Sequence, residues 1–210
     1  MDRDETPRCR VAETEDLRAI YPEPTPRARR KCLPALDRHC RNFIALSPFL
    51  CLGTASESGA DVSPRGDTPG FVQVLDDNTL LIPDRPGNNR LDSLSNVLAN
   101  GHVGLLFMIP GVDETLRVNG VASITTDEHL LARSAVNGKK PKSALLVDVR
   151  EAYLHCGKAL IRARLWHEDA KVERRRLPTL GQMINEQVQD GTTAADADAR
   201  IEYAYKNTLY

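Results

Sequence analysis

Hydrophobic residues in the middle of the chain recur at every second position or in short runs, and turn-forming residues separate these runs. Alternation with a period of two is typical of strands that bury one face. The pattern predicts strands at residues 49–55, 60–64, 70–75, 79–83, 102–109, 115–126 and 143–149, with a hairpin turn at 56–59 and a bend at Gly120.

Other stretches repeat their apolar residues with the spacing of a helix. Leu36, Cys40 and Ile44 share one face of a predicted helix that Pro48 ends. A helix at residues 90–100 has Asn89 as a suitable N-cap, Gly101 just after its end, and Leu91, Leu94, Val97 and Leu98 at core spacing. Further helices are predicted at residues 127–136, 151–164, 180–189 and 196–206.

Strands joined by tight turns, with helices inserted between hairpins, indicate a mainly β (α+β) barrel in one domain, residues 31–210. No G-x-G-x-x-G follows a strand and no P-loop motif is present, so neither a Rossmann nor a P-loop nucleotide site is supported. Residues 1–30 are polar and proline-rich after a short helical stretch at 14–20. We expect them to form an arm that crosses a surface, such as that of a partner subunit.

Composition narrows the class of protein. The 210 residues carry 28 basic and 29 acidic side chains, so the chain as a whole would not attract nucleic acid or an anionic membrane. No apolar run approaches the roughly 18 residues that span a bilayer. Five cysteines without a C-x-x-C pair, and a charged N-terminus, predict a reduced cytoplasmic protein. The His-Cys pairs at 39–40 and 155–156 lack zinc-site spacing, so no metal is expected.

Two arginine-bearing turns are the strongest chemical signal. The first is Ser63-Pro64-Arg65-Gly66-Asp67, and the second is Ile82-Pro-Asp-Arg-Pro-Gly-Asn-Asn-Arg90, directly before the predicted helix. Guanidinium groups and free N–H groups at a helix N-terminus suit a phosphate dianion. A cation such as Arg90 in the first turn is unfavourable unless an anion binds there. The alternatives are that Arg90 is solvated or paired with Asp84 or Asp92, and that the first turn is an ordinary one.

Several motifs in this order resemble the pyridoxamine 5′-phosphate oxidase-like flavoproteins, and in particular a subgroup of FMN-dependent enzymes without an assigned substrate. The motifs are Asp61-Val-Ser-Pro-Arg-Gly66, the run from Ile82 to Arg90, Val103-Gly-Leu-Leu-Phe107, Leu116-Arg-Val-Asn-Gly120, and the later stretch from His155 to Trp166. The resemblance covers about residue 30 to the end.

The resemblance implies a split β-barrel that binds FMN at a homodimer interface. It places Ser63, Pro64 and Arg65 along the flavin, and Asp84, Arg85, Asn88, Asn89 and Arg90 around the ribityl and phosphate groups. Lys158 and Trp166 would come from the C-terminal segment, across the dimer; for Trp166 a core role is the alternative. The oxidase has two basic residues at its phosphate turn and this chain has one, which leaves Arg65 or Arg85 as the second charge.

The predicted function is an FMN-dependent oxidoreductase acting on an unidentified small molecule, with oxygen or a nicotinamide nucleotide as redox partner. No acid or base is assigned. The alternatives are a deazaflavin-using reductase, a haem-binding relative with His102, His129 or His155 as axial ligand, and a flavin-binding dimer without catalysis. Binding of FMN would distinguish the two FMN-binding alternatives from the deazaflavin and haem alternatives. Turnover would then distinguish an enzyme from a flavin-binding dimer.

Overall fold

The computed structural model describes residues 11–210 and divides the chain into two compact units, Met1–Cys32 and Leu33–Tyr210. The described part of the first unit contains two short helices, α1 (Thr14–Ile20) and α2 (Pro26–Arg30), neither of which has a buried residue. Thr25 caps α2 through a hydrogen bond from the Ala28 amide, and Pro26 occupies the first helical position, where its missing N–H costs nothing. The predicted arm therefore contains a second helix, α2, which was not expected because the surrounding residues are rich in proline.

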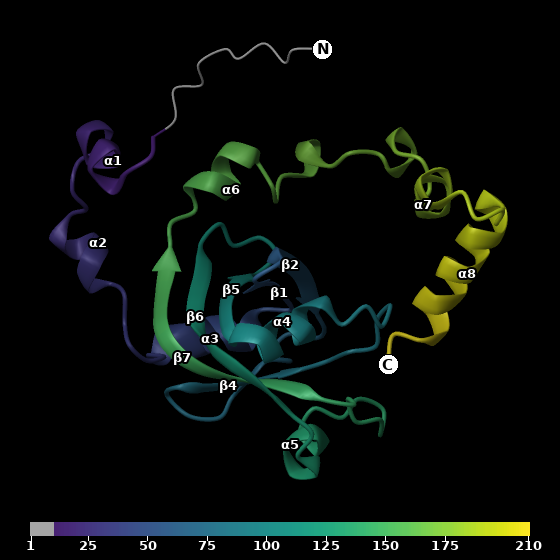
Figure 1. Ribbon diagram of the computed structural model, residues 1–210, viewed down its shortest axis with the longest axis horizontal. Helices are drawn as coiled ribbons and strands as arrows, with labels where there is room; N and C mark the ends of the chain where they lie inside the picture. The colour runs from purple at the N-terminus through teal and green to yellow at the C-terminus, as the bar shows by residue number, and fades with distance from the viewer. Residues whose placement is uncertain (1–10) are drawn as a thin grey trace. The chain divides into compact units, whose positions relative to one another are not determined.

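The second unit is built on one antiparallel sheet of seven strands in the order β2-β1-β5-β6-β7-β4-β3 (Figure 1). This is the α+β split barrel that the sequence predicted. The strands are β1 (Phe49–Ser56), β2 (Gly59–Gly66), β3 (Gln73–Val74), β4 (Thr79–Pro83), β5 (His102–Met108), β6 (Thr115–Thr125) and β7 (Ala144–His155). Of the strand predicted at 70–75, only Gln73 and Val74 pair with β4, and they form β3 at one edge of the sheet.

Alternating side chains of the strands form the core. Leu50 and Leu52 of β1 lie opposite Phe107 and Leu105 of β5, and all four are at most 2% exposed. Burial of each such side chain stabilises the fold by about 1.5–3 kcal/mol. Helix α3 (Arg38–Leu46) adds Cys40 and Ile44 to the same cluster, which confirms the predicted face. Asp37 caps this helix by accepting hydrogen bonds from the His39 and Cys40 amides.

The longest ladder joins β6 to β7 and corrects one predicted element. Residues 151–155 were expected to begin a helix, but they pair with Thr115–Asn119 and extend β7 to His155. The pairing partner decides this, since Ala152 is fully buried and also bridges to Leu33. Helix α6 (Lys158–Ala163) covers only the second half of the expected span. A register shift between Asn119 and Gly120 marks the predicted bend in β6.

Helix α4 (Asp92–Asn100) starts two residues later than predicted. Its N-cap is Leu91 in the left-handed region (φ 62°), without a side-chain cap, so the expected Asn89 cap is wrong. Arg90 therefore precedes the helix. Gly101 ends the helix with φ 72°, as expected. Val97 is buried, but Leu98 is 78% exposed, so the predicted core face is narrower than its apolar spacing suggested.

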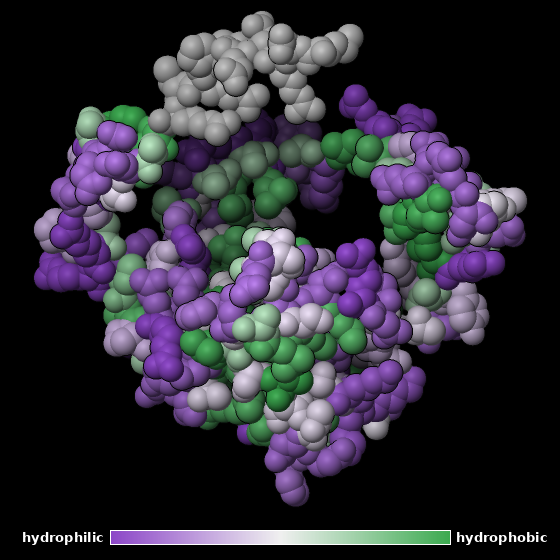
Figure 2. All heavy atoms as spheres, viewed as in Figure 1, coloured by the Kyte–Doolittle hydropathy of each residue, from purple (hydrophilic) through white to green (hydrophobic). Residues whose placement is uncertain are grey.

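Three further helices lie in the second half of the chain. Helix α5 (Glu128–Ala132) is capped by Asp127 and is shorter than the predicted 127–136. Helices α7 (Leu180–Val188) and α8 (Ala194–Asn207) pack on each other, with the Gly181 amide donating to Asp198 at 2.8 Å. Figure 2 shows hydrophobic residues gathered on one side of this pair. No helix in the described part of the chain has both the length and the apolar character needed to cross a membrane.

Gly120 gives a direct test of the β6–β7 ladder. A Cβ on Gly120 would lie 2.3 Å from the carbonyl oxygen of Asp148, whereas a Cβ on Gly53 would meet its nearest neighbour at an ordinary 3.5 Å. We expect Gly120→Ala to lower the free energy of unfolding by about 2–3 kcal/mol through overpacking. Gly53→Ala is the matched control in the same sheet, with a change of less than about 0.5 kcal/mol. Urea unfolding measures both, and equal stability of the two variants would contradict the close approach.

Candidate functional site

The two arginine-bearing stretches meet at one cavity of about 490 Å³. The first was expected to be a turn, but residues 63–66 pair with β1 as the end of β2, and the chain turns only from Asp67 onward. A volume of this size is typical of small-molecule and cofactor sites. Its walls come from β2, the loop from β4 into α4, the loop before β7, and the C-terminal residue. The lining residues are Asp61, Ser63 and Arg65, residues 84–94, residues 139–142, and Tyr210.

Reciprocal ion pairs join the two turns. Arg65 on β2 donates from Nη1 to Asp84 Oδ1 at 2.7 Å, and Arg85 donates from Nε to Asp67 Oδ2 at 2.6 Å. Each turn thus supplies one arginine and one aspartate to the other. The four side chains are at most 23% exposed, so water screens these pairs less than it screens surface pairs. The pairs hold the turns in a fixed relation at the cavity wall.

Both arginines keep one nitrogen available. Nε of Arg65 donates to Ser63 at 3.3 Å, and Nη1 of Arg85 donates to the Ser134 carbonyl at 2.8 Å. Within residues 11–210, Nη2 of either arginine has no hydrogen-bond partner. Each guanidinium is therefore held by two of its nitrogens and can offer the third to a ligand in the cavity.

A chain of hydroxyl groups connects β2 to helix α4. The Ser63 and Ser93 hydroxyls are 3.0 Å apart, and Ser93 donates to Asp61 Oδ2 at 3.1 Å. Ser93 is 4% exposed and lies in the first turn of α4. These bonds fix the N-terminal end of the helix against the edge strand β2.

Asp67, the partner of Arg85, does not itself line the cavity, and its side chain is only 1% exposed. Burial by itself would raise the pKa of Asp67. Hydrogen bonds from the Tyr210 hydroxyl, the Thr68 amide and Arg85 outweigh burial and lower that pKa below its ordinary value. The same bond to Asp67, together with burial, raises the pKa of Tyr210. Asp67 is therefore ionised at neutral pH and Tyr210 is protonated.

Arg90 is paired at the surface. Its Nε donates to Asp92 Oδ2 at 2.7 Å, and its side chain is 73% exposed. Its backbone N–H is satisfied by Asn88 Oδ1 at 3.1 Å. Asn89 and Leu91 on either side have positive φ, a conformation that costs non-glycine residues energy and occurs often at ligand sites. The pair with Asp92 is one of the two alternatives raised from the sequence, and it leaves Arg90 on the cavity lining.

The cavity brings together seven of the ten residues predicted to bind a cofactor. They are Ser63, Arg65, Asp84, Arg85, Asn88, Asn89 and Arg90.

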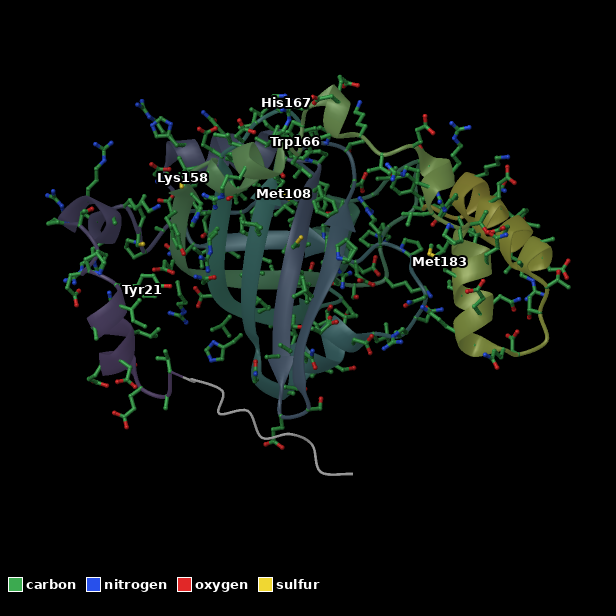
Figure 3. All side chains as sticks on the ribbon, turned by 90° about the horizontal axis from the view of Figure 1, so that it is seen from above. Tyr21, Met108, Lys158, Trp166, His167 and Met183 are labelled. Carbon is green, nitrogen blue, oxygen red and sulfur yellow. The ribbon has the colours of Figure 1, made fainter. Side chains whose placement is uncertain are left out.

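The other three predicted residues lie elsewhere in this chain. Pro64 is exposed, because successive side chains of a strand point to opposite faces. Lys158 and Trp166 lie on one side of the barrel (Figure 3) and do not line the cavity. Trp166 donates from Nε1 to the Val112 carbonyl at 2.9 Å, which anchors the segment after α6 to the turn before β6.

Sequence reasoning missed the lysine-rich loop before β7 and the C-terminal tyrosine. The run Asn137-Gly-Lys-Lys-Pro-Lys142 has turn residues and three cations, a composition that marks an exposed basic loop but not the site it faces. Lys140 forms an ion pair with Glu128, and Lys139 donates to the main-chain oxygen of Tyr210. With these lysines, six basic and three acidic side chains line the cavity, so it favours an anion.

A seven-stranded antiparallel split barrel with an anion-favouring cavity beside its edge strand defines the class of this protein. The model of the family described as pyridoxamine 5′-phosphate oxidase matches residues 36–156. The match covers more than half of the chain, so the protein belongs to the pyridoxamine 5′-phosphate oxidase family. The sequence has no match among curated proteins.

Solved structures of similar fold include three bacterial proteins. HupZ of Group A Streptococcus is 16% identical, with a TM-score of 0.47 over 57% of this chain and 93% of HupZ. A NimC/NimA family protein of Clostridium acetobutylicum is 14% identical, with a TM-score of 0.44 over 58% of this chain and 88% of its own. An FMN-binding protein of Syntrophomonas wolfei is 13% identical, with a TM-score of 0.42 over 57% and 83%.

The lowered pKa of Asp67 predicts a specific pH dependence of stability. The ionised carboxylate stabilises the fold above its unfolded pKa, near 3.8, and this contribution is lost as pH falls through the lower folded pKa. We expect Asp67→Asn to lower the free energy of unfolding by about 3 kcal/mol at pH 7, because it breaks a buried pair.

The difference from the unchanged protein should shrink as pH falls below about 4. Asp169→Asn, which removes an exposed carboxylate paired with Arg164, is the control and should have little effect at any pH. Urea unfolding at pH 7 and at steps down to about pH 2 measures both variants. A deficit for Asp67→Asn that stays the same over this range would contradict the assignment.

Proposed function

We propose that this protein is an FMN-dependent oxidoreductase that acts on a small molecule and holds FMN in the cavity between the two arginine-bearing turns. The observation that supports it most directly is the convergence of seven predicted cofactor residues on one cavity. Membership of the pyridoxamine 5′-phosphate oxidase family supports the same ligand.

The chemistry of the cavity walls fits the phosphate end of FMN. A phosphate dianion needs cations and N–H donors, because a buried charge without partners is unstable. Arg65 and Arg85 each keep Nη2 available, and the first turn of α4 has no side-chain cap, so its amides remain free to donate. The positive end of the helix dipole adds to the attraction.

The walls also offer apolar surface for a flat ring. Leu91, Leu94, Pro86 and Pro141 line the same cavity as the charged groups. Leu91 is 53% exposed, so its side chain is accessible to a ligand in the cavity. Cofactor sites combine apolar surface with placed polar groups, and this cavity offers both, with charged side chains in the larger share.

When bound, FMN would supply the redox chemistry by accepting a hydride or electrons at its ring. The residues of this chain bind and orient it. Arg65, Arg85 and Arg90 would donate hydrogen bonds to the phosphate, while Asn88 and Asn89 would bond to the polar chain between phosphate and ring. The brace between Arg65 and Asp84 keeps these donors in place before the ligand arrives, which lowers the entropy cost of binding.

We propose that the active form is a homodimer, with Lys158 and Trp166 completing the partner's site. Exposed apolar residues on the barrel support a covered face: Val62 on β2 is 68% exposed, and Leu98 on α4 is 78% exposed. Analytical ultracentrifugation should give twice the 23.3 kDa mass of the chain. A monomer that binds FMN with full affinity would contradict the shared site.

Haem is the less favoured ligand of this cavity. An axial ligand would have to come from the cavity wall, and no histidine, cysteine or methionine of the described residues lines it. Tyr210 does line it, but its hydroxyl is bonded to Asp67. The binding test uses FMN itself, so a failure to bind FMN would leave a deazaflavin as the alternative cofactor.

The first prediction on function concerns Arg90. We expect the purified protein to bind FMN and to show an absorbance band at about 450 nm. Arg90→Ala should weaken FMN binding about tenfold, because it removes a charge-assisted hydrogen bond. Arg175→Ala is the matched control, because Arg175 is also exposed and also pairs with a carboxylate two residues away, Glu173. Titration followed by flavin fluorescence measures both variants. Equal affinity of Arg90→Ala and Arg175→Ala would remove Arg90 from the site, and no binding of FMN by the unchanged protein would end the proposal.

Turnover is tested separately. The FMN-loaded protein is titrated without oxygen against a panel of reductants that includes nicotinamide nucleotides. At least one of them should bleach the band at about 450 nm, because a reduced flavin loses this absorbance. Reoxidation by oxygen should restore the band. A protein that binds FMN but is bleached by no member of the panel would instead be a flavin-binding dimer without catalysis.

A further inference from the structure

Tyr210 makes three contacts at the wall of the cavity. Its hydroxyl donates to Asp67 Oδ1 at 2.7 Å, and its ring centroid lies 5.5 Å from the Cζ atom of Arg85. Lys139 donates from Nζ to the main-chain oxygen of Tyr210 at 3.1 Å. The three partners follow β2, follow β4 and lie in the loop before β7, so Tyr210 contacts three separate segments of the barrel.

These contacts tie the C-terminal segment to the barrel. Across the described part of the chain, every hydrogen bond between residues 180–210 and the barrel involves Tyr210. Helices α7 and α8 contact mainly each other. The family match ends at residue 156, so Tyr210 brings to the cavity a group from outside the matched region.

The chemistry of a tyrosine suits both neighbours. Asp67 is a buried carboxylate, and the Tyr210 hydroxyl is one of its three donors. The face of the ring attracts the Arg85 guanidinium, and that attraction is stronger away from water. The ring therefore covers Arg85 while the hydroxyl steadies the carboxylate to which Arg85 is bonded.

We propose that Tyr210 is a positioning residue of this cavity, which holds Arg85 at the wall so that Nη2 is available to the phosphate of FMN. The inference rests on the function proposed above and adds a role for the C-terminal segment in selecting a phosphorylated ligand. Tyr210 acts through Asp67 and Arg85, and it needs no chemistry of its own.

Selectivity for the phosphate is the readout that separates positioning from general damage. Riboflavin is FMN without its phosphate, so the ratio of the two dissociation constants reports the phosphate contacts alone. We expect Tyr210→Phe, which keeps the ring, to weaken FMN binding about threefold, and Tyr210→Ala about tenfold. Riboflavin binding should change less than about twofold in both variants, because its contacts do not include the phosphate donors.

Tyr205 provides the matched control. It lies on α8, the helix that ends just before Tyr210, is 61% exposed and has no hydrogen bond to the barrel within the described residues. Tyr205→Phe and Tyr205→Ala should leave both dissociation constants unchanged, and circular dichroism should show that all four variants are folded. An equal loss of FMN and riboflavin affinity in Tyr210→Ala would overturn the proposal, since it would indicate structural damage only.

A double-mutant cycle tests the route through Arg85. In protein that carries Arg85→Ala, the further change Tyr210→Ala should weaken FMN binding by less than about twofold, because the positioned group is already gone. Independent, multiplying effects of the two substitutions would overturn the proposal. Failure of the proposed function looks different: the unchanged protein would then bind neither FMN nor riboflavin.

Discussion

The pairs Arg65–Asp84 and Arg85–Asp67 join two ends of a sheet that backbone hydrogen bonds do not close. Strand β2 is one edge of the seven-stranded sheet, and β4 lies next to the other edge. An open edge exposes unpaired backbone groups and leaves the flanking turns free to move. Reciprocal ion pairs across the opening fix both turns without a further strand. The cavity exists because this side of the barrel is closed by side chains and not by a ladder.

The same ion pairs also determine which side chains give the cavity its net positive charge. An arginine bonded to a buried aspartate contributes little net charge, and Arg90 and Lys140 are themselves paired with Asp92 and Glu128. The excess of positive charge at the cavity therefore comes mainly from Lys139 and Lys142. The paired arginines contribute a hydrogen-bond donor of fixed orientation, since a guanidinium held by two of its nitrogens keeps the third in one place. Attraction and orientation are thus divided between different side chains. A preorganised donor loses less entropy on binding than a flexible lysine.

Much of the fold followed from the order of residues, and the errors have local causes. The alternation at Phe49–Ser56 and Thr79–Pro83 reports burial of one strand face, a signal that short windows carry well. Residues 151–155 carry no such signal, and their strand is imposed by pairing with Thr115–Asn119. The start of α4 was missed because Leu91 takes a left-handed conformation that its own side chain does not favour. Seven of the predicted cofactor residues came to one cavity because two of them lie at the end of β2, the other five follow β4, and ion pairs join these two places.

The sequence by itself determined the split barrel, the family and the two turns that carry arginine and aspartate, because these depend on periodicity and on motifs a few residues long. Only the tertiary structure decided which aspartate each arginine meets, since Asp67 and Arg85 are 18 positions apart and any of several acids could have been the partner. It also decided that Lys139 and Tyr210 share the cavity, although 71 positions separate them. Contacts between distant segments are set by how the strands pair and pack, and that information is spread over the whole chain and absent from any one motif.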